Sequence, residues 1–103
     1  MRIAVFGGSG RAGEYIIAAC AATEHELVNA DQRSPGPDYR DSGAQILRTD
    51  AENLGEVVAA TRGADAVIHM EAITSPTTEP EYSLFRINMM SNWAILELSL
   101  IHI

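Results

Sequence analysis

The stretch Ile3-Ala4-Val5-Phe6-Gly7-Gly8-Ser9-Gly10-Arg11-Ala12-Gly13 decides the fold. Its first four residues form the short, unbroken apolar run that is typical of a strand covered on both faces. Glycine-rich turn formers follow at residues 7–10, and the pattern beyond them predicts a helix from Arg11 to Thr23. The stretch therefore predicts a strand, a tight turn and a helix.

Residues 7–13, here called the glycine loop, satisfy two spacings at once. They read Gly-x-x-Gly-x-x-Gly from Gly7 and Gly-x-Gly-x-x-Gly from Gly8. A side chain at Gly10 would block the approach of a pyrophosphate to the N–H groups of the helix N-terminus, and one at Gly13 would push helix and strand apart. Such glycines also occur in purely conformational turns, but a buried-type strand before them and a helix after them favour a dinucleotide site.

An acidic residue, Asp31, follows Gly13 by eighteen residues at the end of a second predicted strand, Glu26–Ala30. Its carboxylate can accept hydrogen bonds from both hydroxyls of an adenine ribose and would repel a 2′-phosphate, which favours NAD. Arg11 and Arg33 keep NADP open, because guanidinium groups at these places could grip a 2′-phosphate. The alternatives are a solvated turn residue for Asp31 and a solvent-facing side chain for Arg11.

The rest of the chain continues the alternation of strands and helices. We predict strands at residues 45–47 and 66–70, and a helix at residues 53–62 with Leu54, Val57 and Val58 facing inward. Turn formers interrupt the pattern at residues 34–38 and 75–80. A long helix is predicted from Glu81 to about Leu98, with a core-facing stripe of Phe85, Met89, Trp93 and Leu96.

Strands that alternate with helices predict the α/β class, with a Rossmann-type doubly wound parallel sheet that is truncated after about four strands. A chain of 103 residues holds at most one domain.

The formal net charge of −7, with seven arginines and no lysine, argues against a nucleic-acid partner. No apolar run approaches the roughly 20 residues of a membrane helix, and no signal segment is evident, so we expect a cytoplasmic protein.

The metal-ligating residue types are few and scattered. Cys20 is the only cysteine, which excludes an intrachain disulfide and a cysteine-rich metal site, and its apolar neighbours predict burial. Histidines 25, 69 and 102 lack metal-ligand spacing. We predict no metal.

Several stretches together resemble the NAD-dependent epimerase/dehydratase family, the extended short-chain dehydrogenases/reductases, over nearly the whole chain to about Glu97. The register of Gly7, Gly10 and Gly13 is similar to that family's, residues 64–70 resemble its fourth strand, and residues 88–97 resemble its long fourth helix. The resemblance implies the NAD(P)-binding portion of an oxidoreductase whose parent acts on a sugar, a sugar nucleotide or a related hydroxyl or carbonyl compound. A homodimeric parent is also compatible with it.

The resemblance implies roles for particular residues. The backbone of residues 9–12 would hold the pyrophosphate, residues 50–51 would flank the adenine, and residues 70–72 would line the nicotinamide-side ribose. Asn88 would match the family's helix asparagine that helps to order the water and lysine of a proton relay; a locally bonded polar helix residue is the alternative. The predicted cofactor-binding residues are Gly7, Ser9, Gly10, Arg11, Ala12, Gly13, Asp31, Arg33, Asp50, Ala51, Met70, Glu71, Ala72 and Asn88.

Glu71 departs from the pattern, because the family has small residues at this place and the next. A carboxylate beside the cofactor could face solvent, bond a ribose hydroxyl, or weaken binding through desolvation and repulsion from the diphosphate. The sequence leaves these alternatives open.

The family's catalytic Tyr-x-x-x-Lys pair has no counterpart, because the chain contains no lysine. Tyrosines 15, 39 and 82 are followed four residues later by Ala19, Gly43 and Arg86. We therefore predict no catalytic residue in this chain, and we expect the parent protein to be the enzyme. The alternative is a non-catalytic dinucleotide-binding module, a sensor or regulatory subunit.

The last residues, Leu98–Ile103, depart from the expected helix and resemble a translated transposon-end adapter of the kind used in sequencing libraries. This favours a binding portion at residues 1–97 followed by a non-native tail at residues 98–103; a natural apolar C-terminal turn is the alternative.

Overall fold

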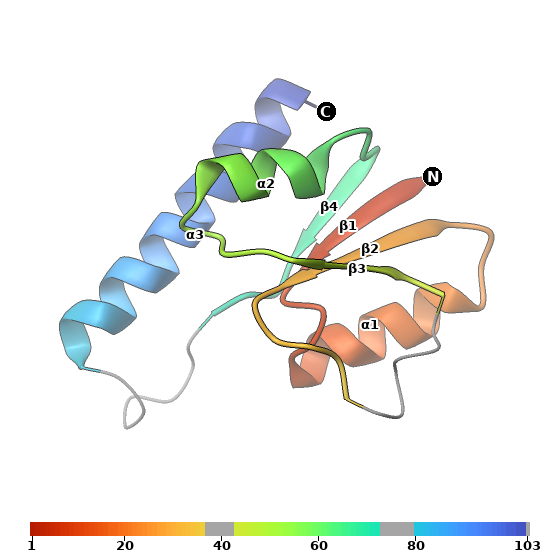
Figure 1. Ribbon diagram of the computed structural model, residues 1–103, viewed down its shortest axis with the longest axis horizontal. Coiled ribbons are helices and arrows are strands. Elements are labelled where there is room, and N and C mark those ends of the chain that lie inside the picture. Colours follow the sequence, from red (N-terminus) through yellow and green to blue (C-terminus); the bar gives the residue numbers. More distant parts are fainter. Residues whose placement is uncertain (37–42, 73–79, 103) are drawn as a thin grey trace.

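The described part of the chain comprises residues 1–36, 43–72 and 80–102 of the computed structural model. Within it, the elements follow one another in the order β1-α1-β2-β3-α2-β4-α3, so β2 alone among the described strands is followed by another strand rather than by a helix (Figure 1). The strands are β1 (Arg2–Phe6), β2 (Glu26–Asp31), β3 (Gln45–Arg48) and β4 (Ala66–His69). The helices are α1 (Arg11–Ala21), α2 (Leu54–Thr61) and α3 (Glu81–His102). The turn predicted at residues 34–38 lies partly outside the described residues, and the one at residues 75–80 lies almost wholly outside them.

The described strands form one parallel sheet in the order β3-β2-β1-β4. Phe6, at the end of β1, lies opposite Ala30 of β2 and His69 of β4, so the carboxyl ends of these strands share one edge of the sheet. β2 lies on one side of β1 and β4 on the other, which makes the gap between β1 and β4 a topological switch point. The predicted Rossmann-type doubly wound sheet is confirmed, and the glycine loop leaves β1 beside this switch point.

Alternate residues of β1 belong to two hydrophobic clusters, one on each face of the sheet. Ile3 and Val5 pack with Ile17 of α1 and with Leu27. The other cluster contains Ala4, Phe6, Ala30, Ala51, Val57, Ala60, Ala64 and Ile95. Helix α1 therefore covers one face, while α2 and α3 cover the other (Figure 1). Burial on both faces explains why β1 shows an unbroken apolar run rather than an alternating one.

Helix α2 begins after Asn53, whose side chain accepts a hydrogen bond from the backbone N–H of Glu56 at 3.2 Å. This N-cap satisfies one of the free donors of the first turn. Val57 is fully buried, as predicted, and Val58 is half-buried. The prediction for Leu54 is wrong, because this side chain is exposed and the buried face of α2 begins one turn later, at Val57.

Helix α3 buries a different face from the predicted one. The predicted core stripe is exposed at all four positions, Phe85, Met89, Trp93 and Leu96. The buried positions are Ser91, Ala94 and Ile95, and Leu98 packs partly against the same cluster. These residues also recur at helical spacing, and the small ones among them let α3 lie close to its neighbours α2 and β4.

Helix α3 also continues beyond its predicted end. The prediction that the helix stops near Leu98 is wrong, since helical backbone extends through His102. Leu98 follows Ser91 and Ile95 at helical spacing and keeps contact with the core, which supports continuation of the helix at this point.

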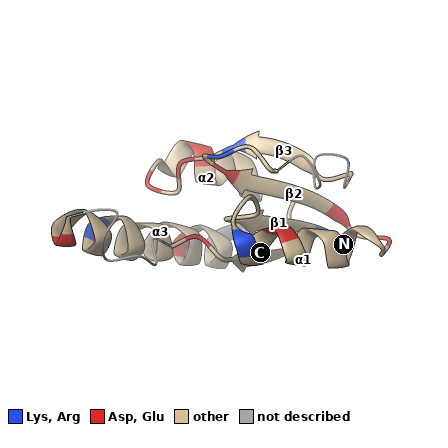
Figure 2. Cartoon of the chain, turned by 90° about the horizontal axis from the view of Figure 1, so that it is seen from below, with Lys and Arg blue, Asp and Glu red and all other residues tan. Residues whose placement is uncertain are grey.

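The charge of the chain is predominantly acidic. Fourteen Asp and Glu residues stand against seven arginines in the sequence. Figure 2 shows acidic residues spread over helices, strands and loops, with fewer basic residues among them.

In the described ranges, no helix combines the length and apolar character that crossing a membrane requires.

Candidate functional site

The first glycine of the glycine loop is required by the backbone. Gly7 has a φ of +80°, in the left-handed region that side chains disfavour. A Cβ at this residue would also lie 2.7 Å from the backbone nitrogen of Glu71, just after β4. The Gly7 N–H donates to the carbonyl of Ala30 at 2.9 Å, so the turn is tied to β2 as well. Gly7 thus lets the ends of three strands come together.

The last glycine of the loop is required by close packing. A Cβ at Gly13 would overlap the carbonyl oxygen of Gly7 and would lie 2.7 Å from the Cα of Gly8. The first turn of α1 therefore rests directly on the backbone that leaves β1. This is the close approach of helix and strand that the glycine spacing predicts.

The N-terminus of α1 has donors available for an anion. Gly10 is the N-cap residue, and no side chain caps the helix there. The free N–H groups and the positive end of the helix dipole together favour an anion at this point. The guanidinium of Arg33 reaches the same place, since its Nη2 atom lies 3.3 Å from where a Cβ of Gly10 would be. Arg11 and Ala12 are exposed at the start of the helix.

Asp31 connects the glycine loop to the end of β2. The residue is only 7% exposed, and its Oδ2 atom accepts a hydrogen bond from the backbone N–H of Ser9 at 3.1 Å. Its Oδ1 atom accepts from the backbone N–H of Arg33 at 3.0 Å, and the Nε of Arg33 lies 3.9 Å away. A carboxylate has about four acceptor positions, so these bonds leave acceptor capacity for a ligand. The alternative of a solvated turn residue does not describe this buried, bonded position.

Asn29 is a part of the site that the sequence analysis missed. Its side-chain nitrogen donates to the hydroxyl of Ser9 at 3.2 Å, and the residue is buried in β2 beneath the loop. Its Oδ1 atom is buried without a hydrogen-bond partner among the described residues. The available signal was a polar amide in the middle of an otherwise apolar strand, where a buried polar group needs a bonding partner.

The residues after β3 are less open than predicted. Asp50 is half-buried, and its Oδ1 atom accepts a hydrogen bond from the backbone N–H of Glu52 at 2.9 Å. Ala51 is 1% exposed within the core cluster, so in this arrangement it offers almost no surface to a ligand. Glu52 pairs with Arg86 of α3 at 3.5 Å. Asp50 is thus the better placed of the two residues predicted to flank adenine.

The residues after β4 border the glycine loop. Met70 and Ala72 are exposed, whereas Glu71 between them is half-buried. Burial raises the pKa of Glu71 to about 7, and the nearby carboxylates of Asp31 and Asp50 add to this shift while Arg33 opposes it. The Oε2 atom of Glu71 is buried with no hydrogen-bond partner in the described part of the chain. The alternative in which Glu71 simply faces solvent therefore does not hold.

Asn88 of α3, the predicted proton-relay residue, takes part in local hydrogen bonds of its helix. The backbone carbonyl of Asn88 accepts hydrogen bonds from the hydroxyl of Ser91 at 3.2 Å and from the side chain of Asn92 at 2.8 Å. Burial lowers the pKa of His69, and the side chain of Asn92 is near enough to offset part of this shift. The proton-relay role of Asn88 stays a prediction.

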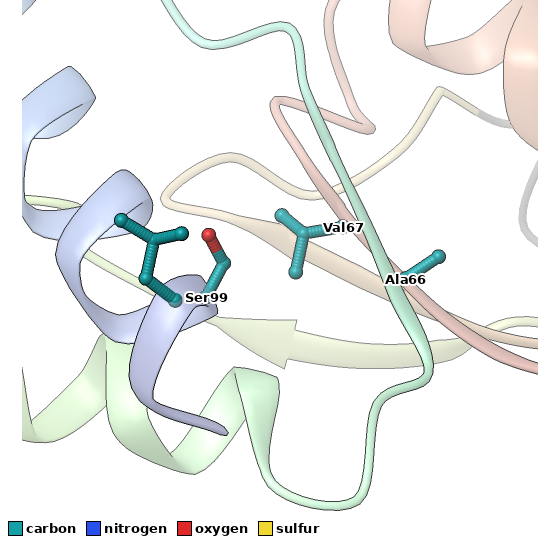
Figure 3. Close-up of a pocket in the computed structure, with 4 residues that line it drawn as sticks. Ala66, Val67 and Ser99 are labelled. Carbon is teal, nitrogen blue, oxygen red and sulfur yellow. The ribbon is translucent and has the colours of Figure 1, made fainter. Parts of the chain in front are cut away.

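The structure thus brings the glycine loop, Asp31, Arg33 and Glu71 together at the switch point. A separate pocket of about 350 Å³ lies elsewhere, lined by Ala66, Val67, Ser99 and Leu100 (Figure 3). Ala66 begins β4, and the loop follows the opposite ends of the strands, so this pocket lies away from the predicted site.

Comparisons with known proteins agree with this fold. Uronate dehydrogenase from Agrobacterium tumefaciens is similar at 21% identity with a TM-score of 0.81, over 98% of this chain and 36% of that one. UDP-glucose 4-epimerase from Thermus thermophilus, in complex with NAD, is similar at 25% identity with a TM-score of 0.80, over 95% of this chain and 33% of that one. UDP-glucose 4-epimerase from Thermotoga maritima, with UDP-glucose, gives 18% identity and a TM-score of 0.87, over 99% of this chain and 35% of that one.

The chain therefore spans about a third of the length of these solved proteins. No match to a curated protein sequence was found. The family model described as "NAD dependent epimerase/dehydratase family" matches residues 3–102, almost all of the 103 residues. With the Rossmann-type sheet and the glycine loop at its switch point, this match establishes that the chain belongs to the NAD-dependent epimerase/dehydratase family.

Proposed function

We propose that this chain is the NAD-binding portion of an epimerase/dehydratase-type oxidoreductase. The observation that carries the proposal is the joining of an uncapped α1 N-terminus to a buried acidic residue, through the hydrogen bond from Ser9 N–H to Asp31. A dinucleotide needs both features, because its pyrophosphate requires N–H donors and its adenine ribose requires an acceptor. When bound, NAD supplies the acceptor or donor of a hydride.

The residues present fit such a cofactor. Of the predicted residues 9–12, Arg11 and Ala12 in the uncapped first turn of α1 would hold the pyrophosphate by their backbone N–H groups, since those of Ser9 and Gly10 already donate to Asp31 and Gly7. Arg33 above Gly10 would add a compensating charge. The remaining acceptor positions of Asp31 would receive the ribose hydroxyls, which favours NAD over NADP because a 2′-phosphate would meet this carboxylate. Asp50 would lie toward the adenine, with Met70, Glu71 and Ala72 along the β4 side of the site.

For the whole protein we propose a small-molecule substrate, a sugar, a sugar nucleotide or a related hydroxyl or carbonyl compound. The similar proteins support this, since they are described as a uronate dehydrogenase and as UDP-glucose 4-epimerases. The sequence contains no lysine, so the Tyr-x-x-x-Lys pair expected from the family is not within these residues.

Calorimetric titration with NAD and with NADP tests the cofactor assignment. We expect saturable binding of NAD, with NADP weaker. Asp31→Asn keeps the shape of the side chain but removes its charge, so NAD binding should weaken by about tenfold or more, the effect of losing a hydrogen bond to a charged group. Glu24→Gln removes an exposed carboxylate and is the matched control, which should bind like the unaltered chain.

Thermal unfolding followed by circular dichroism would verify that each variant folds. The absence of NAD binding to the folded, unaltered chain would overturn the proposal. If the affinity of Asp31→Asn for NAD is unchanged, Asp31 does not bind the cofactor. If Arg33→Ala weakens NADP more than NAD, Arg33 contacts a 2′-phosphate, and the preference for NAD is then limited by this residue.

The second candidate is a non-catalytic dinucleotide-binding module, and the observation that favours it is again the lack of lysine. The two proposals agree on cofactor binding and differ in turnover. Because this chain alone lacks the Tyr-x-x-x-Lys pair under either proposal, the assay that separates them measures conversion of sugar, sugar-nucleotide and uronate substrates by the whole protein, with NAD reduction as only one of its readouts. NAD binding by the whole protein without conversion of any of these substrates favours the module.

A further inference from the structure

Glu71 occupies an unusual position at the switch point. It lies two residues after the end of β4, and its backbone nitrogen would be only 2.7 Å from a Cβ placed on Gly7. Its side chain is half-buried, and its Oε2 atom has no hydrogen-bond partner within the described residues. A buried carboxyl oxygen that lacks a donor is costly when it carries charge. Glu71 is thus a titratable group on the wall of the proposed cofactor site.

The groups that face Glu71 are mostly acidic. Asp31 and Arg33 face it from the end of β2, and Asp50 and Glu52 face it from the turn after β3. Arg33 and Arg86, two arginines of the described residues, have acidic partners of their own. Arg33 lies 3.9 Å from Asp31, and Arg86 lies 3.5 Å from Glu52. The surroundings therefore oppose a further negative charge on Glu71.

We propose that Glu71 makes dinucleotide binding depend on its protonation, donating a hydrogen bond into the site as a neutral acid and opposing the anionic pyrophosphate as a carboxylate. This inference rests on the proposed function, since it assumes that a dinucleotide occupies the glycine loop. Glu71 departs from the small residue that the family resemblance implies at this place.

The direction of the effect follows from the charges. Burial, and then repulsion by Asp31 and Asp50, raise the pKa of Glu71 from its usual 4.5 to about 7. The neutral acid therefore predominates below about pH 7 and the carboxylate above it. A bound pyrophosphate adds negative charge nearby and favours the neutral acid further. Binding should hence be tight below pH 7, weaken above it, and take up a proton at the higher pH.

Calorimetric titration of the full chain with NAD between about pH 6 and pH 8 tests this inference. If binding requires the neutral acid, affinity should fall about tenfold across this range, one factor of ten for each pH unit above the pKa. Repeating the titration near pH 8 in buffers of different ionisation enthalpy should show uptake of about one proton. Glu71→Gln is a neutral analogue of the same shape and should lose both the pH dependence and the proton uptake.

Glu26→Gln is the matched control, because it removes an exposed carboxylate at the opposite end of β2. It should keep the pH dependence of the unaltered chain. Glu71→Ala removes the donor as well as the charge, and should be insensitive to pH but weaker than Glu71→Gln at every pH. This second variant also serves if Glu71→Gln does not fold.

A measurement without cofactor examines the same carboxyl group. The folded chain holds the Glu71 proton up to about pH 7, whereas the unfolded chain releases it near pH 4.5. As the pH rises from about 4.5 to about 7, the unfolding temperature of the unaltered chain should therefore fall relative to that of Glu71→Gln. Above about pH 7 the difference between the two chains should stay constant. A constant difference between the two chains would overturn the inference.

The two proposals fail in different ways. Binding of NAD with an affinity that does not change with pH, or with the same pH dependence in Glu71→Gln, would overturn the role of Glu71 and leave the proposed function intact. The absence of NAD binding at every pH to a folded chain would overturn both.

Discussion

In the glycine loop the residue type is dictated by the space around it, whereas on the outward face of α3 large apolar residues lie exposed to solvent. The outward face comprises the exposed residues Tyr82, Phe85, Met89, Trp93 and Leu96. In the loop, Gly7 and Gly13 occupy places where no larger residue fits. On α3, Phe85 is 68% exposed, whereas Ser91 is 1% exposed against the core.

The difference teaches which kind of constraint can be read from residue types. A backbone approach admits only glycine, so the spacing of the glycines carries the geometry directly. A helix with apolar residues on two faces can bury either one, and the choice depends on what lies beside it. In α3, the face with small residues lies against the other elements and the face with large residues lies outward. Substitutions in the two regions should therefore have very different effects.

The largest effect is expected for Gly13→Ala in the glycine loop. A Cβ here would overlap the backbone of Gly7, which cannot move without displacing the end of β1. We expect a loss of about 4 kcal/mol or more in the free energy of unfolding, the range of severe steric conflicts. Urea denaturation followed by circular dichroism measures this loss.

The control is Gly55→Ala, in α2, where the added Cβ meets only an ordinary contact at 3.4 Å. It should be neutral or stabilising by about 0.5–1 kcal/mol, because alanine favours a helix more than glycine does. If both variants unfold at the same urea concentration, the close approach at Gly13 is not what the loop depends on.

A smaller effect is expected for Ile95→Ala, on the buried face of α3. Ile95 is 2% exposed and packs in the cluster with Phe6 and Val57. Removing its side chain should cost about 3 kcal/mol through lost burial and the cavity that remains. The neighbouring Leu96→Ala is the control, since Leu96 is exposed and its loss should change stability by less than about 0.5 kcal/mol. Equal losses in the two variants would contradict the orientation of α3.

The smallest effect is expected for Phe85→Gln on the outward face. The side chain is mostly exposed, so the substitution should change the free energy of unfolding by no more than about 0.5 kcal/mol. The same denaturation experiment measures it. A loss above about 1.5 kcal/mol would mean that Phe85 is covered in solution, and the contrast between the two faces of α3 would then not hold.

The residues of the candidate site also fall into two groups: those that spacing along the chain predicts, and those that depend on contacts between distant elements. The glycine loop, Asp31 and the strands around them could be predicted, because spacing along the chain and the ends of parallel strands restrict where these residues lie. Asn29 was missed, since its bond to Ser9 exists only when β2 passes beneath the loop. Ala51 was predicted from resemblance at a residue that the core encloses. The sequence left open whether Glu71 faces solvent, bonds a ribose hydroxyl or weakens cofactor binding, and the burial of its Oε2 atom excludes the first of these.

The sequence by itself determined the order of the strands and helices, the parallel sheet and the place of the glycine loop, because local periodicity and glycine chemistry act over a few residues. The tertiary structure alone decided which face of α3 is buried, where α2 begins to pack, and which charges surround Glu71. These depend on contacts between elements far apart in the chain, such as Asp31, Asp50 and Glu71 at the shared edge of the sheet.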